Sequence, residues 1–131
     1  MAIIETPLPG NKYDRKWVFS AITVQGSTTQ IINSDACNIH QIFCDNSANS
    51  VDLYLKIYDN SSGSGVTIAV SLHPDFILKI PSGRSVDYTF LEQPMIISNK
   101  LHAVLSKDPG SSNGSASDTW SSVSVTLFGT D

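Results

Sequence analysis

Apolar and polar residues alternate with a period of two along most of the chain, which is the pattern of β-strands whose two faces meet different surroundings. The clearest example covers residues 53–58, where Leu and Ile positions alternate with Tyr and Lys positions. Residues 123–128 alternate in the same way between Val or Leu and Ser or Thr. Both segments are therefore predicted to be strands with one face buried.

The same period, or a short run of β-branched and aromatic residues, recurs in further segments that we predict to be strands. These segments are residues 16–24, 28–33, 35–45, 76–80, 86–90, 95–97 and 101–105. In 16–24 both faces carry apolar groups, which favours a strand covered on two sides. Residues 35–45 also fit a helical period, and the strand is the interpretation kept here. Turn sequences at Gly26-Ser27 and Pro81-Ser82-Gly83 predict two hairpins, joining 16–24 to 28–33 and 76–80 to 86–90.

Strands at intervals of about 8 to 12 residues, without a convincing helix, are typical of an all-β sandwich or barrel. We therefore expect an all-β fold with two antiparallel sheets packed as a sandwich, of which a jelly roll is one form. Pro7, Pro9 and Gly10 interrupt the pattern near the N-terminus and favour extended or turned backbone over strand pairing. Residues 1–14 are thus predicted to be an extended N-terminal arm, and residues 15–131 a single β-sandwich domain.

The composition excludes several classes of function. Charged residues make up 15% of the 131 residues, against roughly 25% in an average soluble domain. A net charge of -4 provides no positive field for phosphates, so we expect no nucleic-acid partner. No apolar run is long enough to cross a bilayer, and we expect no membrane association. The N-terminus lacks a basic segment followed by an apolar one, which favours synthesis in the cytoplasm.

The candidate catalytic motif is Gly110-Ser111-Ser112-Asn113-Gly114, which matches the Gly-x-Ser-x-Gly pattern of a nucleophilic serine. That motif works at a strained turn between a buried strand and a helix, because the turn presents the hydroxyl to substrate. The flanking residues here predict neither element, so Ser112 is interpreted as a loop residue. We expect no catalytic residue and no enzymatic activity.

A candidate metal site would combine Cys37, His40 and Cys44 with Asp35 or Asp45 as a fourth ligand. On a regular strand Cys37 points to the face opposite His40 and Cys44, and the two cysteines lie more than about 20 Å apart. The same separation disfavours an intrachain disulfide unless the strand folds back. We therefore expect neither a metal ion nor another cofactor.

Aromatic residues offer a third candidate site, since aromatic faces stack on the apolar faces of sugars. Tyr54 and Tyr58 share one face of their strand with Lys56, and Trp17, Tyr88 and Trp120 belong to other segments. The tyrosine stripe is compatible with packing or a subunit interface, with a plain exposed strand, or with a glycan site.

The order of features from about residue 50 to residue 128 resembles a known family. It runs Leu-Tyr-Leu-Lys-Ile-Tyr-Asp at 53–59, Phe-Ile-Leu-Lys-Ile-Pro-Ser-Gly-Arg at 76–84, Tyr-Thr-Phe at 88–90, Leu-His-Ala-Val-Leu at 101–105 and the alternating strand at 123–128. This order is similar to that of small β-sandwich virion proteins of tailed bacteriophages.

The resemblance implies a structural protein of a phage virion, above all a capsid decoration or cement protein that binds neighbouring capsid subunits. The alternative is a carbohydrate- or receptor-binding module of a phage tail or fibre. The expected partners are further copies of the chain, with a trimer favoured, and the major capsid or tail proteins. The candidate interface residues are Ile3, Ile4, Pro7, Tyr13, Trp17, Tyr54, Tyr58 and Trp120.

Overall fold

The computed structural model describes residues 2–7, 13–68, 72–90, 92–110 and 118–131, and these residues form strands and no helix. The strands are β1 (Ala2–Pro7), β2 (Arg15–Val24), β3 (Gln30–Asn33), β4 (Cys37–Asp45), β5 (Leu53–Asn60), β6 (Phe76–Ile80), β7 (Ser85–Thr89), β8 (Met95–Ile97), β9 (Lys100–Ser106) and β10 (Thr119–Thr130). The predictions of an all-β fold, and of strands in the segments named above, are confirmed.

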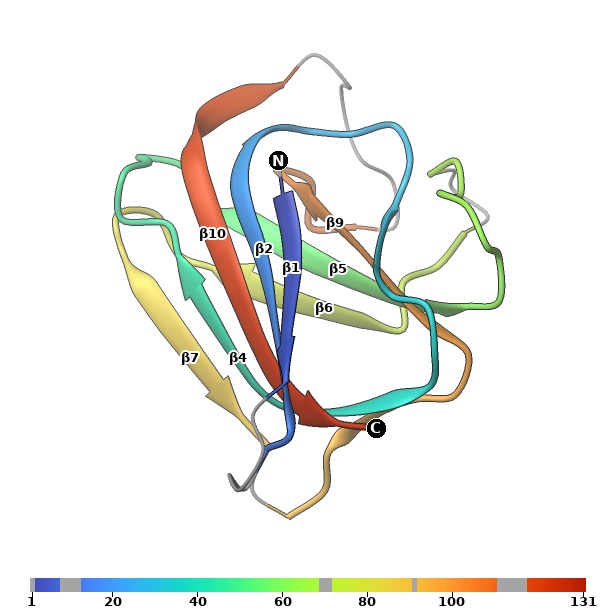
Figure 1. Ribbon diagram of the computed structural model, residues 1–131. Coiled ribbons are helices and arrows are strands. Elements are labelled where there is room, and N and C mark those ends of the chain that lie inside the picture. The colour runs from blue at the N-terminus through green and yellow to red at the C-terminus, as the bar shows by residue number, and fades with distance from the viewer. Residues whose placement is uncertain (1, 8–12, 69–71, 91, 111–117) are drawn as a thin grey trace.

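The strands form two antiparallel sheets. The larger sheet has the order β1-β2-β10-β4-β7, with β8 also paired to β4, and the smaller sheet has the order β3-β9-β5-β6. Figure 1 shows the larger sheet as the front layer, with β5, β6 and β9 behind it. β4 accommodates two neighbours on one edge because β7 pairs with Gln41–Asp45 and β8 with residues 37–39. The arrangement is that of a β-sandwich.

Alternate residues of both sheets point between the layers and form one hydrophobic core. The larger sheet contributes Trp17, Phe19, Ile42, Val125 and Leu127 among others, and the smaller sheet contributes Leu53, Leu55, Ile57, Leu101 and Leu105. Burying side chains of this size supplies roughly 1.5 to 3 kcal/mol each, which is the main term holding the two layers together.

Neither predicted hairpin forms. β2 lies in the larger sheet and β3 in the smaller one, where β3 pairs with β9. Likewise β6 pairs with β5 whereas β7 pairs with β4. The chain crosses from one layer to the other at each turn, so that the apolar faces of both strands point into the shared core. A strand-turn-strand sequence fits this crossing as well as it fits a hairpin.

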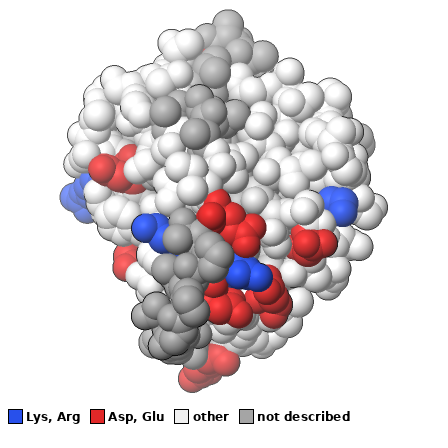
Figure 2. All heavy atoms as spheres, in the orientation of Figure 1, with Lys and Arg blue, Asp and Glu red and all other residues white. Residues whose placement is uncertain are grey.

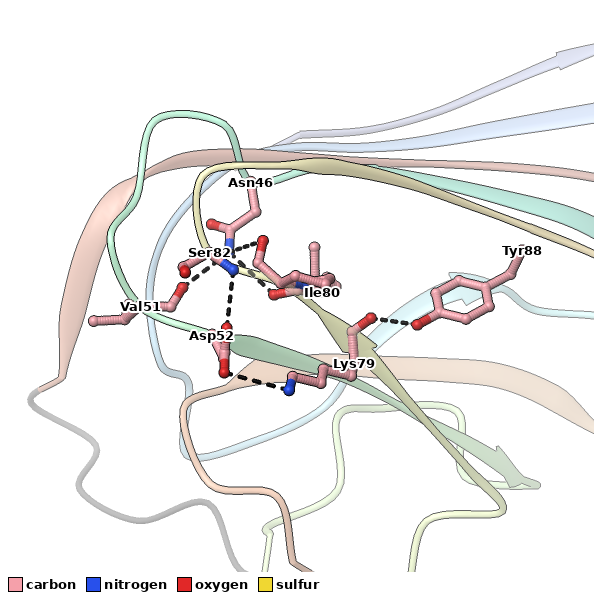
Figure 3. A network of polar contacts seen from close by, with 8 residues as sticks. Asn46, Val51, Asp52, Lys79, Ile80, Ser82 and Tyr88 are labelled. Carbon is pink, nitrogen blue, oxygen red and sulfur yellow. Dashed lines mark hydrogen bonds and ion pairs between the residues drawn. The ribbon is translucent and has the colours of Figure 1, made fainter.

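Polar contacts hold the crossing between β6 and β7 in place (Figure 3). The buried amide Nδ2 of Asn46 donates to the carbonyl oxygens of Val51 at 3.0 Å, Ile80 at 3.1 Å and Pro81 at 3.2 Å. At Gly83 the backbone takes a φ of 67°, a conformation that favours glycine. The turn therefore depends on one buried asparagine and one glycine.

Residues 2–7 are paired, in contrast to the predicted free arm. All six residues of β1 pair with β2, from Ala2 opposite Ser20 to Pro7 opposite Arg15. β1 lies at the edge of the larger sheet, and proline is tolerated at the end of an edge strand. Residues 8–12 lie outside the described residues.

β4 contains an irregularity that strict alternation does not predict. Phe128 of β10 pairs with Gln41 and the next residue, Gly129, pairs with Ile39, so His40 is left out of the ladder. An extra residue of this kind shifts the side-chain alternation by one. As a result Cys37, Ile39, Ile42 and Cys44 all point into the core, although the first two differ in parity from the last two.

The strand at 53–60 is covered on both faces, which corrects the half-buried prediction. Leu55 and Ile57 face the core, and Lys56 and Tyr58, on the opposite face, are also buried. His102 and Val104 are their buried neighbours on β9. The connections before β3 and after β5 supply part of the cover, through Thr29 and Ser62.

Candidate binding surface

The outer face of the larger sheet is open and carries a row of uncharged side chains across four strands. The ladders place Ile4 of β1 opposite Val18 of β2, Val18 opposite Thr126 of β10, and Thr126 opposite Phe43 of β4. Because neighbouring strands lie about 4.8 Å apart, these side chains form a continuous row. We refer to these four residues as the apolar row. It ends at Asp87 on β7.

Two members of the apolar row are strongly exposed. Ile4 has 55% of its surface accessible and Phe43 has 40%, while Val18 and Thr126 are partly exposed. Isolated exposed apolar residues are normal on protein surfaces, but contiguous ones indicate a contact surface. The row is thus the part of this face best suited to be covered by a partner.

A group of rings lies beside the apolar row. The Tyr13 ring stacks on His40, with 5.2 Å between ring centroids, and lies 6.3 Å from Phe128. Phe128 is two residues along β10 from Thr126 and projects from the same face. The ring group widens the uncharged surface.

Charged side chains gather away from the upper part of this face, as Figure 2 shows. Arg15 forms an ion pair with Asp131 at 2.6 Å and another with Glu5 at 3.1 Å, tying β1 and the C-terminal residue to β2. The hydrogen bond to Asp131 raises the pKa of Arg15 above its ordinary value. Exposed pairs of this kind contribute little to stability, but they fix the end of the edge strand.

The sequence-predicted interface residues are divided between the surface and the interior. Ile4 belongs to the apolar row and Tyr13 to the ring group. Ile3 points inward and packs against the core, and Trp17 is fully buried within it. Trp17 is therefore not accessible to a partner. The reason is that even and odd residues of β1 and β2 face opposite sides of the sheet.

The remaining predicted interface residues lie elsewhere. Tyr58 is buried under the cover of the smaller sheet, so it too is inaccessible to a partner, and burial raises the pKa of its hydroxyl to about 12. Tyr54 is partly exposed. Trp120 packs against the core and donates its indole N–H to the carbonyl oxygen of Ile22 at 3.0 Å. The Pro7 side chain lies outside the described part of the structure.

Sequence reasoning missed Phe43 and Phe128 as surface residues. Phe128 belongs to the alternating strand at 123–128, and its outward position follows from the parity of Ser124 and Thr126. Phe43 shares its parity with Ile39 and Cys37, which face the core. Its exposure results from the extra residue at His40, which no local sequence signal marks.

The cysteines do not form the candidate metal site. Cys37 and Cys44 are buried free thiols, and burial raises their pKa values to about 11 and about 12 respectively. Zinc requires thiolates, which burial disfavours. Within the described ranges no group of three or more His, Cys, Asp or Glu side chains is close enough to hold a metal ion. Ser112 lies outside the described residues.

A shallow groove of about 400 Å³ is a second surface feature. It is lined by Phe76, Phe90, Gln93, Pro94, Met95 and Ile96. These residues come from the start of β6, the connection between β7 and β8, and the strand β8. The lining is apolar apart from the amide of Gln93, which gives a ligand one hydrogen-bonding partner among these residues.

No protein-family model matches the sequence, and no curated protein matches it. Across the residues that the structure describes, no helix has the length and hydrophobicity needed to span a membrane.

Proposed function

We propose that the protein is a structural component of a phage virion that acts by association, as a capsid decoration or cement protein. The observation that carries this proposal is the apolar row, in which Ile4 and Phe43 are strongly exposed on the outer face of the larger sheet. A protein that works by binding neighbouring subunits needs such a surface, because burial of apolar area drives association. The resemblance of residues 50–128 to small virion proteins supplies the class of partner.

The strand order supports the finer proposal that the sandwich is a jelly roll. β2, β10, β4 and β7 lie side by side in one sheet, and β3, β9, β5 and β6 in the other. Early strands thus pair with late ones, β2 with β10 and β3 with β9, as expected when a chain is wound as two Greek keys. Jelly rolls are common in viral capsid and lectin domains.

The proposed partners are further copies of the chain and the major capsid or tail proteins. We favour a homotrimer, located in the virion, that contacts its neighbours through the larger sheet. β1 is suited to this role because it is the edge strand and carries Ile4. No catalytic activity, cofactor or nucleic acid enters this proposal.

The test is association measured on variants of the apolar row. Light scattering coupled to size exclusion should give an oligomer for the wild type and smaller species for Ile4→Lys and Phe43→Lys. Cosedimentation with assembled capsids should fall at least about tenfold, as expected for loss of a central apolar contact. Val51→Lys, at an exposed loop position away from this face, is the charge-matched control and should behave as wild type.

A wild-type chain that is monomeric at all concentrations and does not bind capsids would contradict the proposal. So would equal behaviour of the three Lys variants.

The second candidate function is a carbohydrate- or receptor-binding module of a phage tail or fibre. The groove favours it, because the rings of Phe76 and Phe90 lie with the amide of Gln93 in one concave site. Binding to a glycan array that is abolished by Phe90→Ala and retained in Phe43→Lys would favour this function over the first.

A further inference from the structure

His102 lies fully buried beneath two connections that cover the outer face of the smaller sheet. Its Nδ1 is 2.7 Å from the hydroxyl Oγ1 of Thr29, in the connection before β3. Its Nε2 is 3.1 Å from the carbonyl oxygen of Ser62, in the connection after β5. One imidazole therefore joins two loops to the strand β9.

The hydrogen bonds define the tautomer of the ring. A carbonyl oxygen only accepts, so Nε2 carries the proton and donates it to Ser62. Neutral imidazole has one ring proton, so Nδ1 accepts from the hydroxyl of Thr29. The Thr29 oxygen in turn accepts the N–H of Val66 at 3.0 Å. These hydrogen bonds run in one direction, from Val66 through Thr29 and His102 to Ser62, and all of them form only when His102 is neutral.

The two connections also bind one another. The N–H of Thr29 donates to the carbonyl oxygen of Val66 at 2.9 Å, and the N–H of Ile68 donates to Ser27 at 2.9 Å. Thr28 and Thr67 form an antiparallel bridge between these contacts. The paired loops form one cover, and Lys56, Tyr58 and Val104 lie buried on the same sheet face as His102.

The groups around the ring disfavour a positive charge on it. Tyr58 lies directly opposite on β5, with Lys56 two residues along that strand, and Lys100 lies two residues away on β9. On the other side, β3 places Ile31 opposite His102. The covering segments 25–29 and 61–68 contain only Gln, Gly, Ser, Thr, Val and Ile. The carboxylate of Asp59 is bonded to the N–H groups of Ser98 and Asn99 at 2.8 Å each.

We propose that His102 is a pH-sensitive clasp, which holds the paired loops over the smaller sheet when neutral and releases them when protonated. Protonation places a hydrogen on Nδ1, where the hydroxyl proton of Thr29 already points, and adds a buried charge that Lys100 repels. Opening the cover hydrates the ring, which removes the clash of the two protons and the cost of the buried charge. Acidification would thereby expose a sheet face that is closed at neutral pH, independently of the proposed virion function.

The direction of the pH effect follows from burial. Desolvation lowers the pKa of His102 below its ordinary value of 6.5 in the closed state, whereas in the open state the ring titrates normally. The open state thus binds the proton more tightly. Closure is fully favoured above pH 6.5 and weakens as the pH falls from there through the lower pKa of the closed state.

Amide hydrogen exchange of the loop residues tests the clasp, with rates corrected for the intrinsic effect of pH. Between pH 7 and pH 5 the protection of the Val66 and Ile68 amides should fall severalfold in the wild type, because the open state binds the proton more tightly than the closed state. His102→Gln, whose amide can donate to Ser62 and accept from Thr29 without titrating, should show no such fall. His73→Gln, at an exposed histidine, should respond as wild type.

Equal pH dependence in the wild type and His102→Gln would overturn the proposal, as would unchanged protection in the wild type. Should His102→Gln fail to fold, NMR titration of the wild-type imidazoles decides the question. The His102 ring should titrate below pH 6.5, with the loss of protection occurring between pH 6.5 and that midpoint, and a midpoint at or above 6.5 would refute the clasp.

Discussion

The two sheets have similar alternating sequences but opposite outer faces. On the larger sheet the outward residues, such as Ile4 and Phe43, are exposed. On the smaller sheet the outward residues Lys56, Tyr58 and Val104 of β5 and β9 are as buried as those in the core, whereas Ile77 on the edge strand β6 is exposed. The difference arises from the connections, because the loops before β3 and after β5 lie over the β5 and β9 part of the smaller sheet and leave the larger sheet open. Polarity along a strand therefore does not establish which face meets solvent.

The two outer faces also differ in how their ionisable groups meet water. Under the loops, burial lowers the pKa of Lys56, opposed by the nearby charge of Asp108, and raises that of Tyr58 to about 12. On the open face the ring group of Tyr13, His40 and Phe128 remains partly exposed. The covered face is thus where a change of protonation affects folding, and the open face is where association can occur without unfolding.

The largest difference is expected when the same charge is introduced on each face. Val104→Lys buries an ammonium group directly opposite Lys56, and we expect it to lower the free energy of unfolding by about 4 kcal/mol or to prevent folding. Phe43→Lys places its ammonium in water beside Asp87 and should cost no more than about 1 kcal/mol. Urea denaturation of the two variants measures both values.

Equal losses in these two variants would show that the loops do not exclude water from the smaller sheet.

Much of the fold follows from the sequence, for a simple reason. The alternation at 53–58, 101–105 and 123–128 marks strands because a pleated chain between two surroundings needs period two. The pairing of those strands is not encoded locally. The turn at Pro81–Gly83 suits a hairpin and a crossing equally, and the choice depends on Asn46 and on the core contacts of both strands.

The candidate binding surface was less predictable than the fold. Ile4 and Tyr13, in the predicted N-terminal arm, were among the candidate interface residues, whereas the outward position of Phe43 depends on a residue inserted opposite β10 at His40. The buried environment of Tyr58 and His102 depends on loops whose Ser, Gly and Thr composition suggests only an exposed connection. Such features depend on contacts between residues far apart in the chain.

A smaller difference in stability is expected between alanine variants of two glutamines, one under the cover and one on the open face. Gln25 is buried, and its Oε1 accepts from the hydroxyl of Ser106 and the N–H of Lys107, both at 3.1 Å. Gln25→Ala leaves the buried hydroxyl of Ser106 and the partly buried N–H of Lys107 without this acceptor, and we expect a loss of about 2 kcal/mol in thermal or urea unfolding.

Gln41 is the matched control on the open face. Its Nε2 donates to Asp87 at 2.8 Å, at an exposed position where water replaces the contact. Gln41→Ala should change the free energy of unfolding by no more than about 0.5 kcal/mol. If the two alanine variants lose the same stability, Gln25 does not hold the cover to β9.

The smallest expected effect concerns the hydroxyl of Tyr58, which is buried with no hydrogen-bond partner among the described residues. Removing an unpaired buried hydroxyl relieves its desolvation, so Tyr58→Phe should leave stability unchanged or raise it by up to about 1 kcal/mol. Tyr88→Phe is the matched comparison, because the Tyr88 hydroxyl donates to the carbonyl oxygen of Lys79 (Figure 3). That variant should lose about 1 kcal/mol. A destabilised Tyr58→Phe would mean that the Tyr58 hydroxyl has a hydrogen-bond partner beneath the cover. The polar groups of the covered face would then make hydrogen bonds beyond those of Thr29, Ser62 and Gln25.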